Sequence, residues 1–527
     1  MEIIAMSQGF PPLGRLIRFA FAASGVLPRK RGEQDGMTES EKKAIQKQLE
    51  RLVNEEGSLV DRHAELVKAL AFAIAGTIDD IKSNFAIGET VLDLLEVYQA
   101  VIRSDGSYLD ERESLKWFAR CYAIPRLAMS IQKQLLRFNL SAEGFDTPTD
   151  ADWFLPTLSS SSIRWPLANA IEWVYAICNM SQTSFHCSGQ TALEATPQQR
   201  QNLENAADWL KGRRLPSWPA LYWNFSTSLS LLATLDDPHD RREITPALRM
   251  SIVHVLFLAR VSTYVCQSIE SAYGAAFLSQ LIEQFQRHTR WLNNDLAKFR
   301  ADVEAYLDET SLPENERDAI WLNASEHYWK WYVSHATEVG SRMHALWIES
   351  NGVLSDALVD AWADAKGDHP VRSTIEFMMI ARDYELPDGF ATALMDAQRL
   401  RTNKESSLVD VDRYIDVLRQ IGLDSRLSWI EPWLRGEINY RHGDHDAAFT
   451  QFEAALARAK YCAGAQQDQI VNRYIELAAK TDRWKCFKSG IEWARYLGIA
   501  IRLLRGSEAT EENLRAIFAI MKQVHYA

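Results

Sequence analysis

Residues 433–456 read WLRGEINYRHGDHDAAFTQFEAAL, a stretch that predicts two α-helices joined by a tight turn. Gly443 and Asp444 mark the turn, because glycine readily ends a helix and a Gly-Asp pair breaks helical spacing. We expect the first helix to end near Arg441 and the second to begin near His445. The stretch therefore predicts an antiparallel helix hairpin.

Small side chains stand where the two helices of this hairpin would cross. Gly436 lies in the first helix, and Ala448 and Ala455 lie in the second. Their small size lets the two backbones approach closely, while Phe452 and Leu456 supply bulk beside them.

These residues resemble the tetratricopeptide repeat, a family of stacked helix hairpins. Its pattern of a small residue, a Gly-Asp turn and Ala-x-x-x-Phe-x-x-Ala-Leu is matched by Gly436, Gly443, Asp444, Ala448, Phe452, Ala455 and Leu456. The chain departs from the pattern at Pro432, Arg435, Asn439 and Lys460, where the family tends to have an aromatic residue, leucine, tyrosine and proline. These departures weaken the packing of the first helix more than that of the second.

A single repeat of this kind cannot bury its apolar face, so about three stacked units are normally needed. Residues 472–498 again predict a helix, a polar turn and a helix, and residues 409–423 predict the second helix of a preceding unit. We therefore expect a C-terminal α-solenoid that resembles tetratricopeptide repeats over residues 371–527.

The resemblance also implies a binding groove. In that family the first helix of each repeat lines the groove. The groove side of this first helix would therefore present Trp433, Glu437, Tyr440 and Arg441 to a protein or peptide partner. Glu437 would repel a carboxylate, so a clamp for the acidic tail of a chaperone is not expected. An aromatic groove of mixed charge fits a helix or a mixed peptide better.

Composition narrows the class of protein. The chain has 527 residues, of which 47% are hydrophobic and 24% charged, so it is a folded protein of several domains or one long solenoid. Its formal net charge of −12 argues against nucleic acid or an anionic membrane as a partner. Six scattered cysteines without a C-x-x-C pair indicate buried, reduced thiols in a cytoplasmic protein.

The N-terminus permits two interpretations. The apolar run from Phe19 to Leu27 is too short to span a bilayer and is followed by Pro28 and basic residues instead of a cleavage site. Thr38 with Glu41 has the pattern of a capping box, so Met37 is an alternative start. Breaks in helical spacing then divide the chain into 1–36 (an extension or loose arm), 37–140 (N-terminal helical domain), 141–246 (loop-rich helical middle region), 247–370 (central helical region) and 371–527 (repeat region).

Two stretches of the central region carry histidines. Residues 250–261 are apolar around most of a helix and predict a helix buried on all sides, with His254 as a core residue. Residues 325–347 hold several tryptophans together with His327 and His335. Because the H-E-x-x-H spacing is absent there, we interpret this cluster as packing and expect no metal site.

The sequence lacks the glycine-rich phosphate-binding loops and the hydrolase elbow, and we assign no catalytic residue and no cofactor. We expect an all-α protein, with an N-terminal and central helical bundle before the solenoid, that acts as a scaffold or regulator of a protein or peptide partner. Oligomerisation is compatible with this interpretation.

The alternative is an effector enzyme with the repeat region as sensor or oligomerisation arm. Arg249 with His254, and Arg435 with His442, show the arginine-to-histidine spacing of some all-helical ribonucleases. An open pocket with convergent histidine, glutamate and arginine within residues 247–350 would favour this alternative.

Overall fold

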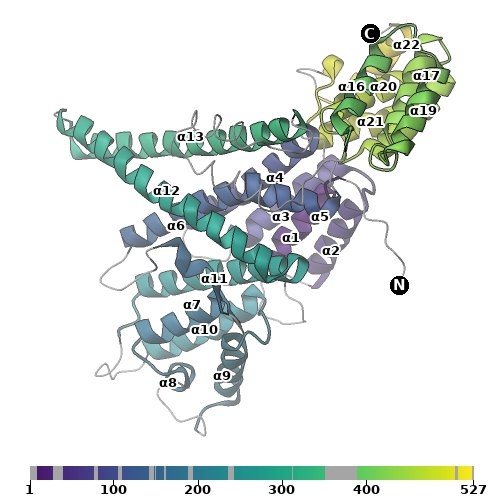
Figure 1. Cartoon of the computed structure of the whole chain (residues 1–527). Coiled ribbons are helices and arrows are strands. Elements are labelled where there is room, and N and C mark those ends of the chain that lie inside the picture. The colour runs from purple at the N-terminus through teal and green to yellow at the C-terminus, as the bar shows by residue number, and fades with distance from the viewer. Residues whose placement is uncertain are drawn as a thin grey trace.

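The computed structural model describes residues 9–27, 39–75, 81–104, 110–141, 148, 150–159, 162–187, 194–234, 242–310, 312–349, 388–504 and 508–524. Most of these residues, about 79%, are helical and almost none are in strands, which confirms the all-α class. The β-structure within them is one antiparallel hairpin of β1 (Thr157–Leu158) and β2 (Ile163–Arg164). Figure 1 shows a body of packed helices, a long projecting arm and a C-terminal lobe.

The N-terminal part of the body is a bundle in which each early helix packs on the next. Its helices are α1 (Leu13–Ser24), α2 (Glu39–Val53), α3 (Leu59–Ala75), α4 (Ile81–Ser104), α5 (Glu111–Phe118) and α6 (Ile124–Ser141), with the π-helical turn η1 (Ala119–Ala123) between the last two. The extra residue of a π-turn leaves backbone groups without their usual helical partners. Gln284 meets this need, because its side-chain amide donates to the carbonyl of Arg120 at 2.9 Å.

Residues 9–27 belong to this bundle. This part of the N-terminal segment 1–36, which we expected to be an extension or loose arm, is therefore integral to the fold. Phe10, Ile17 and Phe21 are buried in the main core, and the amide of Phe10 donates to the carbonyl of Tyr461 at 2.9 Å. The amphipathic spacing of α1 gives it one apolar face, which packs on α2, α4 and α11. Thr38, the predicted helix cap, lies outside the described residues.

The middle region forms a second group of helices below the bundle in Figure 1. It contains η2 (Ala151–Phe154), α7 (Pro166–Ile177), α8 (Gln182–His186), α9 (Pro197–Leu210), α10 (Trp218–Ala233) and α11 (Pro246–Tyr273). Residues 250–261 lie in α11, and most are buried, as predicted, because this helix packs against α1, α7, α10 and α12. His254 is buried with them.

Helix α11 is long and apolar enough to cross a membrane by length and composition alone. Just over half of its apolar window, 56%, is buried inside the fold, as in the core helix of a globular domain. Its Arg260 donates to the carbonyl oxygens of Ala22 and Ala23 and to that of Pro216. The contacts to Ala22 and Ala23 satisfy carbonyl groups in the last turn of α1, where carbonyls lack partners within their own helix.

The arm consists of α12 (Ala275–Asp308) and α13 (Glu314–Glu349), each about 50 Å long at ~1.5 Å per residue. Figure 1 shows the two helices meeting at a tip away from the body and diverging toward their other ends. Aromatic rings fill the space between them, with Phe299 of α12 4.9 Å from Tyr328 and Trp291 5.8 Å from Tyr332. In the described part of the tryptophan-rich stretch, Tyr328, Trp329 and Tyr332 are buried, as the packing interpretation predicted, whereas Trp331 is 49% exposed.

The C-terminal lobe contains α16 (Phe390–Thr402), α17 (Leu408–Gln420), α18 (Ile430–Arg441), α19 (His445–Ala459), α20 (Gln466–Lys480), α21 (Trp484–Leu497), η3 (Arg502–Leu504) and α22 (Glu511–Gln523). Each α-helix packs on its sequence neighbour. Residues 371–387 of the predicted repeat region lie outside the described residues.

The lobe and the bundle share one apolar core, and they also complete each other's helix ends. Gln467 of α20 donates to the carbonyl of Ile102 at 2.9 Å, in the last turn of α4. In return, Gln99 of α4 donates to the carbonyl of Tyr496 in the last turn of α21. The terminal carbonyls of a helix lack intrahelical partners. The bundle and the C-terminal lobe therefore each supply side chains that cap helices of the other.

A related contact caps the start of α3. The first amide of this helix, at Leu59, donates to the carboxylate of Glu492 in α21. A carboxylate is favourable at this end because the helix dipole is positive there. The main core cluster accordingly runs from Phe10 to Met521, so the bundle and the C-terminal lobe share buried residues of one cluster.

Candidate functional site

The hairpin of residues 433–456 forms as predicted. α18 ends at Arg441 and α19 begins at His445. Gly443 has a φ of +79°, a conformation that costs a glycine little, and the side chain of Asp444 accepts the amide of Ala447 to cap α19. The turn is therefore encoded by local residues.

Gly436 allows the two helices of this hairpin to touch. A Cβ atom at this position would lie 2.7 Å from Cδ2 of Phe452. The following hairpin, α20 with α21, uses the same device, because a Cβ at Gly490 would lie 2.7 Å from Cγ1 of Ile475. Both crossings depend on an absent side chain.

Two of the four predicted groove residues are buried. Trp433 is only 1% exposed, 5.5 Å from Trp429, with the guanidinium of Arg401 5.6 Å from its ring centre. Glu437 is 8% exposed, and its carboxylate lies 3.7 Å from the guanidinium of Arg473. Neither side chain offers an open surface, because neighbouring helices of the lobe cover both.

The other two predicted residues, Tyr440 and Arg441, are half-buried. The hydroxyl of Tyr440 donates to Glu476 at 2.6 Å. Arg441 donates to the backbone carbonyl of Asn403, which brings the loop after α16 beside the end of α18. The structure thus places the accessible part of the predicted site at the C-terminal end of α18.

A charged cluster from α20 joins these residues. Glu476 is paired with Arg473 at 2.7 Å and with Lys480 at 3.0 Å, and the guanidinium of Arg473 lies 3.9 Å above the Tyr440 ring. Burial, together with the carboxylate of Glu476, raises the pKa of Tyr440. Burial disfavours the cationic form of Arg473, but Glu437 and Glu476 outweigh this effect and raise its pKa. Arg473 therefore stays a guanidinium cation and Tyr440 a neutral phenol at neutral pH.

Sequence reasoning missed the α20 members of this cluster. Their spacing, i to i+3 from Arg473 to Glu476 and i to i+4 from Glu476 to Lys480, is a recognisable signal for pairing on one helix face. What it could not show was that this face lies against Tyr440.

We call the group of Arg401, Lys404, Arg441, Arg473 and Lys480 the basic face. The side chains of Arg473 and Lys480 are only 17% and 5% exposed and lie mostly below the surface. Lys404 is exposed and follows Asn403, the residue that Arg441 contacts. Three carboxylates, Glu405, Glu437 and Glu476, belong to the same region, and Asp444 stands in the turn after Arg441, so the cations outnumber the carboxylates by one. The sign of this excess is opposite to the net charge of −12 of the whole chain.

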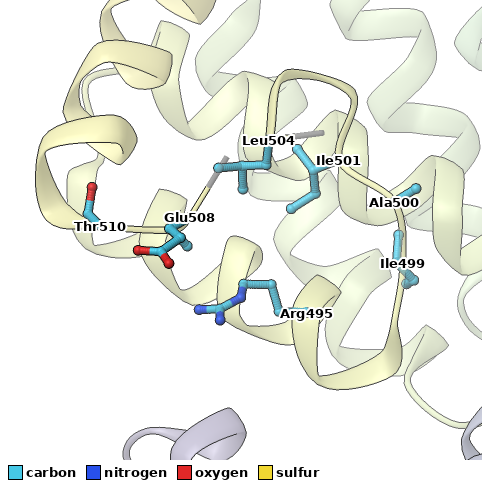
Figure 2. A pocket seen from close by; sticks show the side chains of 8 residues that line it. Arg495, Ile499, Ala500, Ile501, Leu504, Glu508 and Thr510 are labelled. Carbon is cyan, nitrogen blue, oxygen red and sulfur yellow. The ribbon is translucent and has the colours of Figure 1, made fainter. Parts of the chain in front are cut away.

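A cavity of about 590 Å³ lies elsewhere in the lobe, where the chain passes from α21 to α22. Figure 2 shows Ile501 and Leu504 on one side of it and the charged ends of Arg495 and Glu508 on the other. An apolar wall with one cation and one anion could accept part of a peptide, but this cavity contains none of the predicted residues.

The residues considered for catalysis do not converge on a cavity within the described part of the chain. His254 is 4% exposed inside α11. Arg435 is paired with Asp412 at 2.5 Å and with Glu431 at 3.1 Å. A second cavity, of about 440 Å³, lies between the loop after α9 and α11 and is lined by arginine, tyrosine, glutamine and serine, without histidine or glutamate.

The described residues contain no group of three or more His, Cys, Asp or Glu placed to hold a metal ion. His335 stacks on Trp331 at 5.5 Å, and His327 contacts the carbonyl of Asn323 at 2.8 Å. The six cysteines are free thiols, and burial raises the pKa of Cys178, Cys266 and Cys462 to about 12. These thiols are protonated and packed, as predicted for inert core cysteines.

No protein-family model, no curated protein and no solved structure matches this chain.

Proposed function

We propose that this protein binds an acidic segment of a protein partner on the basic face of its C-terminal lobe, and that α16–α22 form a solenoid of tetratricopeptide-like hairpins that carries this face. The observation that supports the proposal is the excess of cations over carboxylates around Tyr440 and Arg441, on a chain of net charge −12. A positively charged patch on a negatively charged protein attracts and orients a negatively charged partner.

The solenoid part of the proposal is supported by the repeated hairpin design. α18 with α19, and α20 with α21, each cross at a glycine, Gly436 and Gly490, that brings the helices into contact. Successive hairpins that pack on each other leave the first helix of each pair along one side, where a partner can lie across several of them. The basic face draws on α16, α18 and α20, the first helices of three successive pairs.

The pairing of Glu437 changes the expected partner. An unpaired glutamate in the groove would disfavour an acidic peptide, as argued from the sequence. In the structure Arg473 lies 3.7 Å from this carboxylate and compensates it, while Lys404 is exposed and Arg441 half-buried. A glutamate- or aspartate-containing peptide is therefore a better fit than a mixed or apolar helix.

The test uses three fluorescently labelled peptides, one rich in glutamate, one with glutamine in place of every glutamate, and one rich in lysine. Fluorescence anisotropy with the full chain should show tightest binding of the acidic peptide, and this binding should weaken as salt is added, since salt screens exposed charges.

The matched variants are Arg441→Glu on the basic face and Arg300→Glu on the arm. Arg441→Glu should weaken binding of the acidic peptide at least tenfold, because it changes the local charge by two units, and Arg300→Glu should leave it unchanged. Equal binding of the acidic and glutamine peptides, or equal effects of the two variants, would show that the basic face is not the binding site.

A further inference from the structure

The first two helices of the C-terminal lobe expose an apolar stripe. Val409 and Val417 of α17 are 55% and 51% exposed, Ile421 directly after this helix is 39% exposed, and Met395 of α16 is 54% exposed. The opposite side of α17 supplies the core residues Val411, Tyr414, Ile415 and Leu418. The exposed side of the helix thus carries this apolar row together with the charged residues Asp412, Arg413, Asp416 and Arg419.

Among the described residues of the lobe, α16 and α17 come first in the helical order, and this exposure is unusual at such a position. End helices normally carry a polar outer face, because no further repeat covers them. An exposed valine or isoleucine alone needs no explanation, but several in one row mark a contact surface.

The exposed residues of the row along α17 are evenly spaced, so the row coincides with itself when the helix direction is reversed. Val409, Arg413, Val417 and Ile421 follow at intervals of four residues and form a single ridge on the helix surface. Ridges of this kind pack into the grooves of another helix in the commonest class of helix contact. Reversing the ridge about Ile415, its midpoint, exchanges Val409 with Ile421 and Arg413 with Val417.

From this symmetry we infer that α17 is a self-association surface, on which the α17 of a second copy of this chain packs in antiparallel orientation across a two-fold axis. Val409 of one copy then faces Ile421 of the other, and Val417 faces the aliphatic stem of Arg413. A two-fold contact requires a self-complementary patch, and this row meets that requirement.

The charges of α17 support the same arrangement. In the antiparallel register, Asp416 of one copy lies about one residue, ~1.5 Å along the axis, from Arg413 of the other. Each now pairs within its own helix, Arg413 with Asp410 at 3.4 Å and Asp416 with Arg419 at 2.9 Å. Exposed ion pairs of this kind contribute little to stability, so replacing them with ion pairs between two copies costs little free energy.

The test is the mass of the full chain in solution, measured by light scattering during gel filtration over a hundredfold range of concentration. We expect a dimer for the unmodified chain and a monomer for Val417→Glu, which places two carboxylates at the centre of the contact. Ile520→Glu, at an equally exposed apolar position in α22 at the other end of the lobe, should remain dimeric.

A charge exchange distinguishes this register from other contacts. Arg413→Glu and Asp416→Arg should each weaken dimerisation at least tenfold, and the chain with both substitutions should recover it, because every Arg413–Asp416 pair is then restored with reversed polarity. A monomer at all concentrations would overturn the inference, as would equal effects of Val417→Glu and Ile520→Glu, or a double variant no better than the single ones.

Discussion

Gly436 illustrates, at the scale of a single residue, how the absence of a side chain determines the packing of a hairpin. Alanine favours a helix over glycine by ~1 kcal/mol, so the substitution would stabilise an isolated helix. In this hairpin the added methyl group would lie 2.7 and 2.8 Å from ring atoms of Phe452, inside contact distance, and Phe452 is itself fully buried. Packing therefore opposes helix propensity at this position.

We expect Gly436→Ala to destabilise the protein by about 1–3 kcal/mol, the usual cost of overfilling a packed core. Urea unfolding followed by circular dichroism measures this change. The control is Gly88→Ala in α4, where no atom lies within 4 Å of the added group, so helix propensity should prevail and stability should rise or stay level. If both variants gain stability, the close crossing of α18 and α19 is not real.

At the scale of an element, α8 shows how a helix of five residues is held in place. Its His186 is fully buried, with Nε2 2.9 Å from the hydroxyl of Tyr175 in α7 and Nδ1 3.0 Å from that of Ser228 in α10. Burial lowers the pKa of His186 to about 3, so the ring is neutral in the folded protein at any ordinary pH. One neutral imidazole thus connects three helices.

This burial predicts a dependence of stability on pH. Unfolded, the histidine has a pKa near ~6.5, so below that pH the unfolded chain takes up a proton that the folded chain does not. Stability is therefore fully present above pH ~6.5 and is lost as the pH falls toward about 3, by up to ~1.4 kcal/mol per pH unit from this residue. His186→Gln should reduce this slope.

Urea unfolding at several pH values between 7 and 4 measures the slope, and His327→Gln, at an exposed position on α13, is the control. The substituted chain is compared with its own stability at neutral pH, so a general loss of stability does not affect the result. An unchanged slope in His186→Gln would mean that this ring is protonated in the folded protein.

At the scale of the whole molecule, the bundle and the C-terminal lobe are joined by side chains of each part that cap helices of the other. Gln467 is fully buried, and it satisfies the carbonyl of Ile102 near the end of α4. A buried carbonyl without a partner costs about 1–3 kcal/mol. The ion pair between Lys460 and Glu55, at 2.5 Å, joins the same two parts.

We expect Gln467→Leu to loosen this junction, because leucine has a similar size but cannot donate to the carbonyl. Amide hydrogen exchange should rise in the last turn of α4 and in α20 and α21, with little change in the distant helices α7 and α10. Gln469→Leu, on the exposed side of the same helix, serves as the control and should exchange like the unmodified chain. Faster exchange throughout the chain would indicate general unfolding instead of a local junction.

Much of this fold follows from neighbours in the sequence. The turn at Gly443 and Asp444, the ends of α18 and α19 and the buried character of α11 were all predictable, because caps, turns and helical spacing act over a few residues. The same local rules predicted a helix at residues 409–423, and it forms as α17.

The candidate site was predictable only in part. Tyr440 and Arg441 lie near the surface, whereas Trp433 and Glu437 are covered. Which face of α18 stays open depends on Arg401 and Arg473, which lie about thirty residues away in other helices. Helical spacing reveals an amphipathic face but not which helix covers it.

The sequence by itself therefore determined the helices, their turns and the tight crossing at Gly436, because these depend on backbone conformation and side-chain size at adjacent positions. Only the tertiary structure decided that residues 13–24 form a core helix, that Glu437 is neutralised by Arg473, and that α4 caps α21 and is itself capped by Gln467 of α20. Each of these depends on groups far apart in the chain, whose burial and charge are known only once the helices have packed.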